Sequence, residues 1–266
     1  MKRRFSCALI TGGSSGLGAE FATQLSERVD TLVLVARRTA KLETIADRLR
    51  KESPKTAIVT ITADLSKEGE RHSLATDLIG KNLVPDLLIN NAGLGDYGEF
   101  TGAQWDDIDR MLKVNIEALT HLSHLFAGRM AQKGDGVILN VSSLASTMPI
   151  ADFAVYAATK AYVSSFTEAL RIELREEGVD VLALCPGPVK TEFGDVARRE
   201  GRKSGMPPTG GFFYVSKEQV VSEAIEGMDR RKARVFPGLQ IAAAGLIFGA
   251  LPLAALRLMM KHRPRR

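Results

Sequence analysis

Short apolar runs alternate with amphipathic stretches along most of the chain, and this alternation predicts the elements. The apolar runs are five to nine residues long, as expected of strands buried on both faces, and they lie at 5–10, 31–36, 57–62, 86–90, 136–143, 179–187 and 234–238. Helical periodicity is clearest at about 40–51, 104–132 and 153–177. Repeated βα units predict an α/β fold: a doubly wound parallel sheet of about seven strands, with helices on both faces, in a single domain.

The alternation fails between Pro186 and Lys217. This stretch contains two adjacent prolines and the aromatic run Phe212-Phe213-Tyr214. A long segment without periodicity in a compact domain is usually a binding loop or a lid. It follows the carboxyl end of a predicted strand, where ligands bind in open α/β sheets. We expect a substrate loop at about 188–216; the alternative is a surface loop without a binding role.

The segment from Leu239 to Leu256 contains 18 residues and no charge. As one helix it would span about 27 Å, close to the bilayer core of about 30 Å. Pro252 argues against an uninterrupted span. Two interpretations stay open: association with a membrane, or a helix buried at a subunit interface or over the substrate pocket. We therefore divide the chain into a catalytic domain, 1–238, and an apolar C-terminal helix with a basic tail, 239–266.

Composition places the chain among globular proteins, because 45% of its 266 residues are hydrophobic and 25% are charged. The N-terminal residues run directly into the first strand, so we expect no signal peptide. Cys7 and Cys185 both fall in predicted core strands, where a free thiol acts as a small apolar group. We therefore expect a reducing compartment, the cytoplasm, with membrane association if the C-terminal segment provides it.

The net charge of +5 is concentrated in basic clusters at 2–4, 198–199, 230–234 and 257–266. No aromatic residues are interleaved and no recognition motif is present, so we expect no nucleic-acid partner. An anionic membrane surface suits the C-terminal cluster better.

A glycine-rich turn follows the first predicted strand and precedes a helix. Gly12, Gly16 and Gly18 allow a tight turn and close approach of a ligand to the backbone. The N–H groups at the start of the following helix favour a pyrophosphate. The context is that of a dinucleotide-binding loop.

Tyr156 and Lys160 lie one helical turn apart, and Ser143 precedes the tyrosine by thirteen residues. An ammonium beside the phenol favours the phenolate and would lower the tyrosine pKa toward neutrality. The Ser143 hydroxyl would hold a substrate oxygen against that tyrosine. Ser142, its neighbour on the strand, would point to the opposite face.

These motifs, together with NNAG at 90–93, Asn115 and PGPVKT at 186–191, resemble the short-chain dehydrogenase/reductase family. The resemblance implies a Rossmann-like fold and four catalytic residues: Asn115, Ser143, Tyr156 and Lys160. Asn115 would help to organise a water link from the lysine to solvent. The resemblance and the glycine loop imply cofactor contacts from Gly12, Ser14, Ser15, Gly16, Leu17, Gly18, Arg37, Arg38, Asp64, Leu65, Asn91, Ala92, Gly93, Tyr156, Lys160, Pro186, Gly187, Val189 and Thr191.

The second strand ends in Val35-Ala36-Arg37-Arg38. A carboxylate there would bind the ribose 2′-hydroxyl of NAD, whereas arginines pair with a 2′-phosphate. We therefore predict NADP(H) as the cofactor. We expect no metal, because His121 and His124 share a helix face without further ligands at metal-binding spacing.

The expected function is an NADP(H)-dependent oxidoreductase that interconverts a carbonyl and an alcohol. Phe193, Phe212, Phe213 and Tyr214 in the loop favour a hydrophobic substrate such as a steroid, retinoid, acyl or sphingoid ketone. The alternatives are an epimerase or dehydratase of the same fold, and a non-catalytic dinucleotide-sensing scaffold. We expect a homodimer or homotetramer.

Overall fold

A computed structural model describes residues 3–197 and 211–260, excluding the side chains of residues 212, 259 and 260. Its strands form one sheet in the order β3-β2-β1-β4-β5-β6-β7, and all neighbouring pairs are parallel. The strands are β1 (Phe5–Thr11), β2 (Val29–Ala36), β3 (Ala57–Thr62), β4 (Leu87–Asn90), β5 (Gly136–Val141), β6 (Val179–Leu184) and β7 (Arg234–Val235). The predicted single-domain, doubly wound fold is confirmed.

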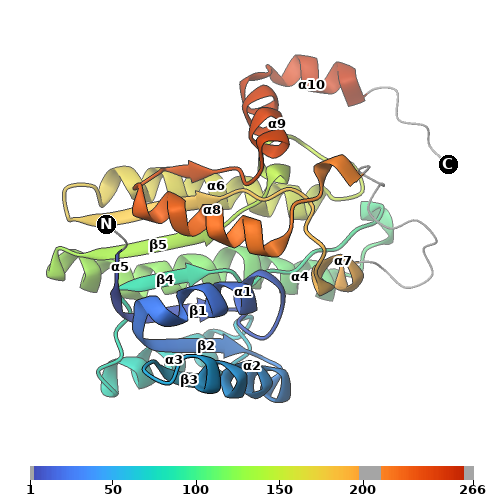
Figure 1. Cartoon of the computed structure of the whole chain (residues 1–266). Helices are drawn as coiled ribbons and strands as arrows, with labels where there is room; N and C mark the ends of the chain where they lie inside the picture. Colours follow the sequence, from blue (N-terminus) through green and yellow to red (C-terminus); the bar gives the residue numbers. More distant parts are fainter. Residues whose placement is uncertain (1–2, 198–210, 261–266) are drawn as a thin grey trace.

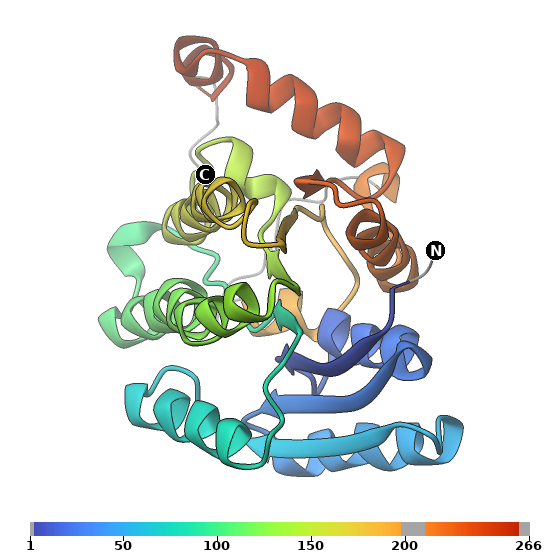
Figure 2. The same cartoon turned by 90° about the vertical axis from the view of Figure 1, so that its left-hand side faces the viewer.

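Successive residues of the central strands face opposite sides of the sheet, so each strand contributes to two cores. On β2, for example, Leu32 and Leu34 join one core and Val33 and Val35 the other. The first core is covered by α1 (Gly16–Leu25), α2 (Thr39–Glu52) and α8 (Lys217–Asp229), and the second by α3 (Glu68–Gly80), α5 (Leu119–Lys133) and α6 (Ala154–Glu173). Helices accordingly lie on both sides of the sheet (Figures 1 and 2).

The long helix predicted over 104–132 contains a change of helical type. It begins as α4 (Trp105–Leu112), widens into a π-helical segment (Lys113–Ala118) and continues as α5. Asn115 lies within the widened segment and is buried. π-Helical turns of this kind occur mostly as single insertions in α-helices and are frequent at functional sites.

Strands are added to one side of β1 as far as β3 and to its other side from β4 onward, so the strand order reverses between β1 and β4. Hydrogen bonds join the carboxyl ends of these two strands. The backbone N–H of Asn91 donates to Thr11 Oγ1 (3.0 Å), and Asn91 Nδ2 donates to the Thr11 carbonyl (2.9 Å). Ligands of open α/β sheets bind at such a switch point, outside the carboxyl ends of the strands.

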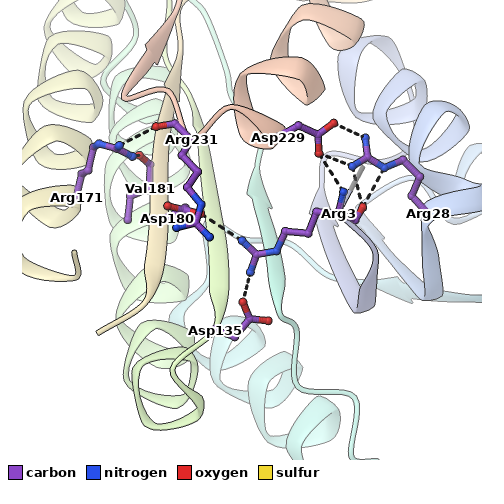
Figure 3. Close-up of polar contacts among 8 residues, drawn as sticks. All are labelled: Arg3, Arg28, Asp135, Arg171, Asp180, Val181, Asp229 and Arg231. Carbon is purple, nitrogen blue, oxygen red and sulfur yellow. Dashed lines mark hydrogen bonds and ion pairs between the residues drawn. The ribbon is translucent and has the colours of Figure 1, made fainter. Parts of the chain in front are cut away.

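The opposite, amino edge of the sheet is held by ion pairs (Figure 3). The Arg3 guanidinium bridges Asp135 and Asp180, and Arg28 donates two hydrogen bonds to the carboxylate of Asp229 (3.1 and 2.5 Å). Arg231 also pairs with Asp180 (3.4 Å). Parts of two basic clusters noted in the sequence therefore contribute to this edge of the fold.

The uncharged C-terminal segment forms two helices rather than one. α9 (Leu239–Ala250) ends at Leu251, where the backbone is extended, and α10 (Leu253–Met260) starts after Pro252. The proline interrupts the helix because it lacks an N–H and clashes with the preceding turn. Within residues 3–197 and 211–260, no helix combines the length and apolar character needed to cross a bilayer. α9 and α10 stand at the top of the molecule in Figure 1, beyond the layers that enclose the sheet.

The remaining described helices are short. They are α7 (Glu192–Val196) and the 3₁₀ turns Ser26–Arg28, Phe100–Gly102, Leu144–Thr147 and Gly211–Phe213. The predicted substrate loop, 188–216, is described only over 188–197 and 211–216; Arg198, Arg199 and the paired prolines lie outside the described residues, as does most of the basic tail.

Candidate active site

A cavity of about 960 Å³ opens at the carboxyl edge of the sheet and brings most of the predicted site residues together. Its walls include the glycine loop, the end of β2, the turn after β4, and the segments that carry Ser143, Tyr156 and Lys160. All predicted site residues line it except Gly18 and Asn115, which lie behind the wall. The predicted cofactor and catalytic residues therefore belong to one cavity.

The glycine loop is closed so tightly that side chains are excluded. A Cβ on Gly18 would lie 2.2 Å from the Gly12 carbonyl oxygen, which no side chain tolerates. Gly12 and Gly16 have positive φ angles of 69° and 57°, a region that favours glycine. The loop thereby presents bare backbone to the cavity at the start of α1, which suits a phosphate group.

Arg38 is the arginine that reaches the glycine loop. Its guanidinium donates to Ser15 Oγ (2.8 Å) and Ser14 Oγ (3.4 Å). Arg37 lines the same cavity and its side chain is exposed. Among the described residues, the hydrogen bonds to the loop hydroxyls come from Arg38, and both arginines stay predicted partners of a 2′-phosphate.

The turns after β3 and β4 complete the wall beside the loop. Asp64 Oδ1 accepts hydrogen bonds from the N–H and hydroxyl of Ser66 (3.0 and 2.8 Å), which fixes the turn that also presents Leu65. Asn91, Ala92 and Gly93 are held through Thr11, whose hydroxyl also accepts from the Ala92 N–H (3.0 Å).

Ser143 and Tyr156 meet across the cavity floor. Ser143 lies just after β5 and Tyr156 stands in the first turn of α6, and the Ser143 side chain is close enough to the tyrosine to act on its pKa. Ser142 turns away and donates to the Lys160 carbonyl (2.9 Å). The prediction that the two serines face opposite ways is correct.

Burial, and not the lysine, dominates the pKa of Tyr156. Desolvation raises the Tyr156 pKa to about 12, and the hydrogen bond from Ser143 opposes this rise. The expected lowering by Lys160 is not found, because Lys160 Nζ donates to the Val141 carbonyl (2.8 Å) and lies 5.7 Å from the centre of the tyrosine ring. Burial also lowers the Lys160 pKa to about 8.

Asn115 is fixed behind the site by three hydrogen bonds. Its Oδ1 accepts from the Leu94 N–H (2.8 Å), and its Nδ2 donates to the Leu94 carbonyl (2.9 Å) and to Thr159 Oγ1 (3.0 Å). A Cβ on Gly93 would lie 3.5 Å from both Asn115 Oδ1 and Lys160 Nζ, so all three groups are close. The Asn115 side chain thus positions the loop beside the lysine.

An aromatic wall surrounds Tyr156, and the sequence interpretation found only part of it. Phe153 stacks on the tyrosine with ring centres 4.1 Å apart, and the ring of Phe193 is tilted against the tyrosine with centres 5.6 Å apart. Phe213, Tyr214 and Phe248 also line the cavity; nothing is described for the side chain of Phe212. Phe153 was missed, although its position one turn before Tyr156 places both on one helix face.

The segment after β6 closes the remaining side. Pro186 accepts from the Leu144 N–H (2.8 Å), and Gly187 packs so closely on Ile241 of α9 that a Cβ would lie 2.4 Å from its Cδ1. Val189 lines the cavity, and Thr191 caps α7 by accepting from the Phe193 N–H (3.4 Å). These contacts connect the cavity to the C-terminal helices.

The two helical histidines have no metal-site geometry. His121 Nδ1 accepts from Arg71 Nε (3.2 Å), and burial followed by the charge of Arg71 lowers the His121 pKa. Over residues 3–197 and 211–260, no three His, Cys, Asp or Glu side chains are grouped as metal ligands.

Known proteins share this sequence pattern and this fold. The family model described as short chain dehydrogenase matches residues 6–201. A very-long-chain 3-oxoacyl-CoA reductase-like protein of Arabidopsis thaliana is 34% identical over 202 residues, which are 73% of this chain. The chain spans 62% of that relative's own length.

Solved structures resemble the whole chain. A short-chain dehydrogenase from Sphingobium yanoikuyae in complex with NADPH is 31% identical, with a TM-score of 0.79 over 98% of this chain and 97% of its own. A bulky-bulky ketone specific alcohol dehydrogenase from Comamonas testosteroni is 30% identical, with a TM-score of 0.77 over 98% and 95%. From the family model and these full-length likenesses it follows that the chain belongs to the short-chain dehydrogenase/reductase family of oxidoreductases.

Proposed function

We propose that the protein is an NADP(H)-dependent oxidoreductase that interconverts hydrophobic ketones or aldehydes and their alcohols. One observation carries this proposal: Ser143 and the buried side chains of Tyr156 and Lys160 share a cavity with a compact glycine-rich loop. Proton-transfer groups and a phosphate-binding loop are therefore in reach of one bound dinucleotide and one substrate.

The residues present fit a nicotinamide dinucleotide. A Cβ at Gly12 or Gly18 would collide with Asn91, and at Gly18 also with the Gly12 carbonyl, so glycine keeps this loop compact. The compact loop leaves the backbone N–H groups at the start of α1 available to a pyrophosphate. Arg38 offers a guanidinium beside two loop hydroxyls, the donor set expected for a 2′-phosphate. The Sphingobium relative was solved with NADPH, which supports NADP(H) here. Another relative of the same fold, from Burkholderia phymatum, was solved with NAD, so the choice has to be tested.

The cofactor supplies the hydride chemistry when it is bound, and the protein handles the proton. In the reductive direction, Ser143 donates a hydrogen bond to the substrate oxygen, and the Tyr156 hydroxyl donates its proton to that oxygen. A tyrosine with a pKa raised by burial is protonated at neutral pH and is ready to donate. Lys160, whose Nζ lies 5.7 Å from the centre of the ring, stabilises the phenolate that remains. Asn115 holds the backbone of Leu94, next to Gly93 and the lysine.

The aromatic wall supports a hydrophobic substrate. Tyr97, Phe153, Phe193, Phe213 and Phe248 line the same cavity as Tyr156. The names of two relatives, a bulky-bulky ketone specific alcohol dehydrogenase and a very-long-chain 3-oxoacyl-CoA reductase-like protein, point to substrates of this character. We propose ketones with long or bulky apolar groups as the substrate class, in preference to small polar carbonyls.

Two alternatives remain distinguishable from this proposal. An epimerase or dehydratase would use the same tyrosine and lysine but consume no net NADPH. A non-catalytic scaffold would bind a dinucleotide and turn over nothing. The intact Ser143, Tyr156 and Lys160 set favours net oxidoreduction.

The assay that tests the proposal follows NADPH oxidation across a series of ketones of increasing chain length and bulk, with NADH in parallel. We expect NADPH to support turnover that rises with apolar bulk. A chain that binds NADPH and oxidises none of it with any member would contradict the proposed reaction. Faster turnover with NADH would contradict the proposed cofactor.

We also propose a cytoplasmic homodimer or homotetramer that can contact anionic membranes through α10. Leu253 and Leu258 on α10 are exposed, and Arg257 adds a positive charge between them. Size-exclusion chromatography with light scattering measures the oligomer. Sedimentation with phosphatidylserine vesicles, comparing the full chain with one ending at Leu251, tests the membrane contact; equal sedimentation of both would contradict it.

A further inference from the structure

The carboxylate of Glu192 is bound between two cations, Arg38 and Lys41, and Arg38 lines the cavity in which a cofactor phosphate is expected. Its Oε2 accepts from Arg38 Nη1 (2.8 Å), and its Oε1 accepts from Lys41 Nζ (2.5 Å). Lys41 lies in the first turn of α2, and Arg38 directly precedes that helix. Glu192 begins α7, more than 150 residues further along the chain, so the contact exists only in the folded protein.

The same Arg38 guanidinium reaches the glycine loop through Ser15 Oγ (2.8 Å). Arg38, Ser14, Ser15 and Glu192 all line the cavity that contains the candidate active site. The carboxylate is therefore inside the dinucleotide site and is not a remote surface pair.

We propose that Glu192 is a specificity-determining residue: its carboxylate occupies the cationic site of Arg38 and Lys41, so a cofactor 2′-phosphate must displace it whereas a 2′-hydroxyl need not. This inference rests on the proposed use of a nicotinamide dinucleotide by this cavity. In this arrangement Glu192 is an internal competitor that weakens the binding of NADP(H) relative to NAD(H).

The charge of Glu192 sets the direction of its effect on NADPH binding, and its exposure to solvent limits the size of that effect. The two cations hold the pKa of Glu192 at about 2, chiefly through the hydrogen bonds from Lys41 and Arg38, so the group is ionised at every working pH. A dianionic phosphate is repelled by this carboxylate and attracted by both cations. About half of each side chain is exposed, with side-chain exposures of 44%, 46% and 50% for Arg38, Glu192 and Lys41, so solvent screens the competition.

The neutral variant Glu192→Gln keeps the size of the side chain and removes its charge. Because both ion pairs are exposed and screened by solvent, each contributes little, and we expect NADPH to bind about 3- to 10-fold more tightly to the variant. NADH lacks the phosphate, and we expect its Kd to change by less than about 2-fold.

Dissociation constants of NADPH and NADH, measured by the fluorescence of the reduced nicotinamide on the full chain, test this expectation without a substrate. Glu226→Gln is the matched control, because Glu226 forms an exposed pair with Arg230 on α8 (2.7 Å) and its loss changes the net charge equally. A second pair of variants, Arg38→Gln with and without Glu192→Gln, completes a double-mutant cycle. With Arg38 removed, the gain from Glu192→Gln should shrink.

Tighter NADPH binding in Glu192→Gln only, reduced in the Arg38→Gln background and accompanied by unchanged NADH binding, supports the proposal. Equal effects on NADPH and NADH, weaker NADPH binding in Glu192→Gln, or the same gain from Glu226→Gln overturns it. The proposed reaction is tested independently of the role of Glu192. A protein that shows this binding pattern but reduces no ketone would support the role of Glu192 and contradict the proposed oxidoreductase activity. Binding of neither dinucleotide overturns both.

Discussion

The ring of Phe153 lies almost flat against the ring of Tyr156, with centres 4.1 Å apart and planes inclined by 20°. The stack holds the tyrosine from the apolar side and leaves its hydroxyl toward Ser143. The Tyr156 ring is positioned by Phe153, whereas the Tyr156 hydroxyl would transfer the proton. Different substitutions can therefore remove the ring contact or the hydroxyl separately.

Tyr156→Phe removes only the hydroxyl and keeps the ring that Phe153 contacts. We expect turnover to fall by at least about 100-fold, because the proton donor is lost, while the NADPH dissociation constant stays within about 2-fold. Steady-state assays and fluorescence titration measure the two quantities. Phe153→Leu is the control that loses the stack and keeps the hydroxyl, and it should retain more activity. Full activity in Tyr156→Phe would remove the tyrosine from the mechanism.

The low pKa of Lys160 makes stability depend on pH in a defined direction. Its folded pKa of about 8 is below the ordinary value of 10.5, so between these values the unfolded chain binds a proton that the folded chain has released. Stability contributed by this group therefore rises with pH across that window. Below pH 8 both states are protonated and the burial penalty is fully present.

Denaturant unfolding of the wild type and of Lys160→Met, from pH 7 to 9.5 without dinucleotide, measures this contribution. The free energy of unfolding of the wild type, relative to the variant, should increase by about 1–2 kcal/mol between pH 8 and 9.5. Cys7, whose thiol pKa is raised to about 12 by burial, titrates in both chains and cancels in the difference. A difference that does not vary with pH would show that the lysine is not desolvated.

Asp229 joins α8 to the amino edge of the sheet, where it accepts from both terminal nitrogens of Arg28 and from the Arg3 N–H. Its ion pair with Arg28 is mostly buried, with side-chain exposures of 20% and 13%. Asp229→Asn should lower the free energy of unfolding by about 1–3 kcal/mol, because the mostly buried Arg28 guanidinium loses its counter-charge. Glu226→Gln, on the same helix but in an exposed pair, should cost less than about 0.5 kcal/mol. Equal losses in urea unfolding would contradict this assignment.

Ile241 attaches α9 to the cavity wall, since it is fully buried and contacts Gly187. Ile241→Ala should lower the free energy of unfolding by about 2–4 kcal/mol through the cavity that it leaves. Leu246→Ala, on the same helix at a position 71% exposed, should change it by less than about 0.5 kcal/mol. If thermal unfolding shows the same small loss of stability for both variants, α9 does not unfold cooperatively with the rest of the protein.

The sequence was sufficient for the sheet because its strands are buried on both faces. Runs such as 31–36 are then apolar at nearly every position, and this run starts two residues later than β2 and ends with it. The grouping of Ser143, Tyr156 and Lys160 also followed from sequence, since one strand end and one helix turn carry all three. Gly12, Gly16 and Gly18 were predicted from their context for the same reason.

What sequence could not supply are relationships between distant segments. Glu192 meets Arg38 and Lys41 only because α7 returns to the end of β2, and no spacing encodes that return. Phe248 reaches the cavity from a helix that was interpreted either as membrane-bound or as buried. The environment that raises the Tyr156 pKa depends on three-dimensional burial, which an i, i+4 spacing does not reveal.

The π-helical segment Lys113–Ala118 allows one continuous helix to serve two different cores. A widened turn contains one extra residue, which advances the following positions by about 100° around the axis. Met111, before the segment, packs with Phe153 and Tyr156, whereas Leu122 and Phe126, after it, pack against the sheet. The insertion therefore rotates the second half of the helix relative to the first, so that each half directs its apolar side chains into its own core. Without the extra residue the helix would be regular, and only one of the two halves could face its core.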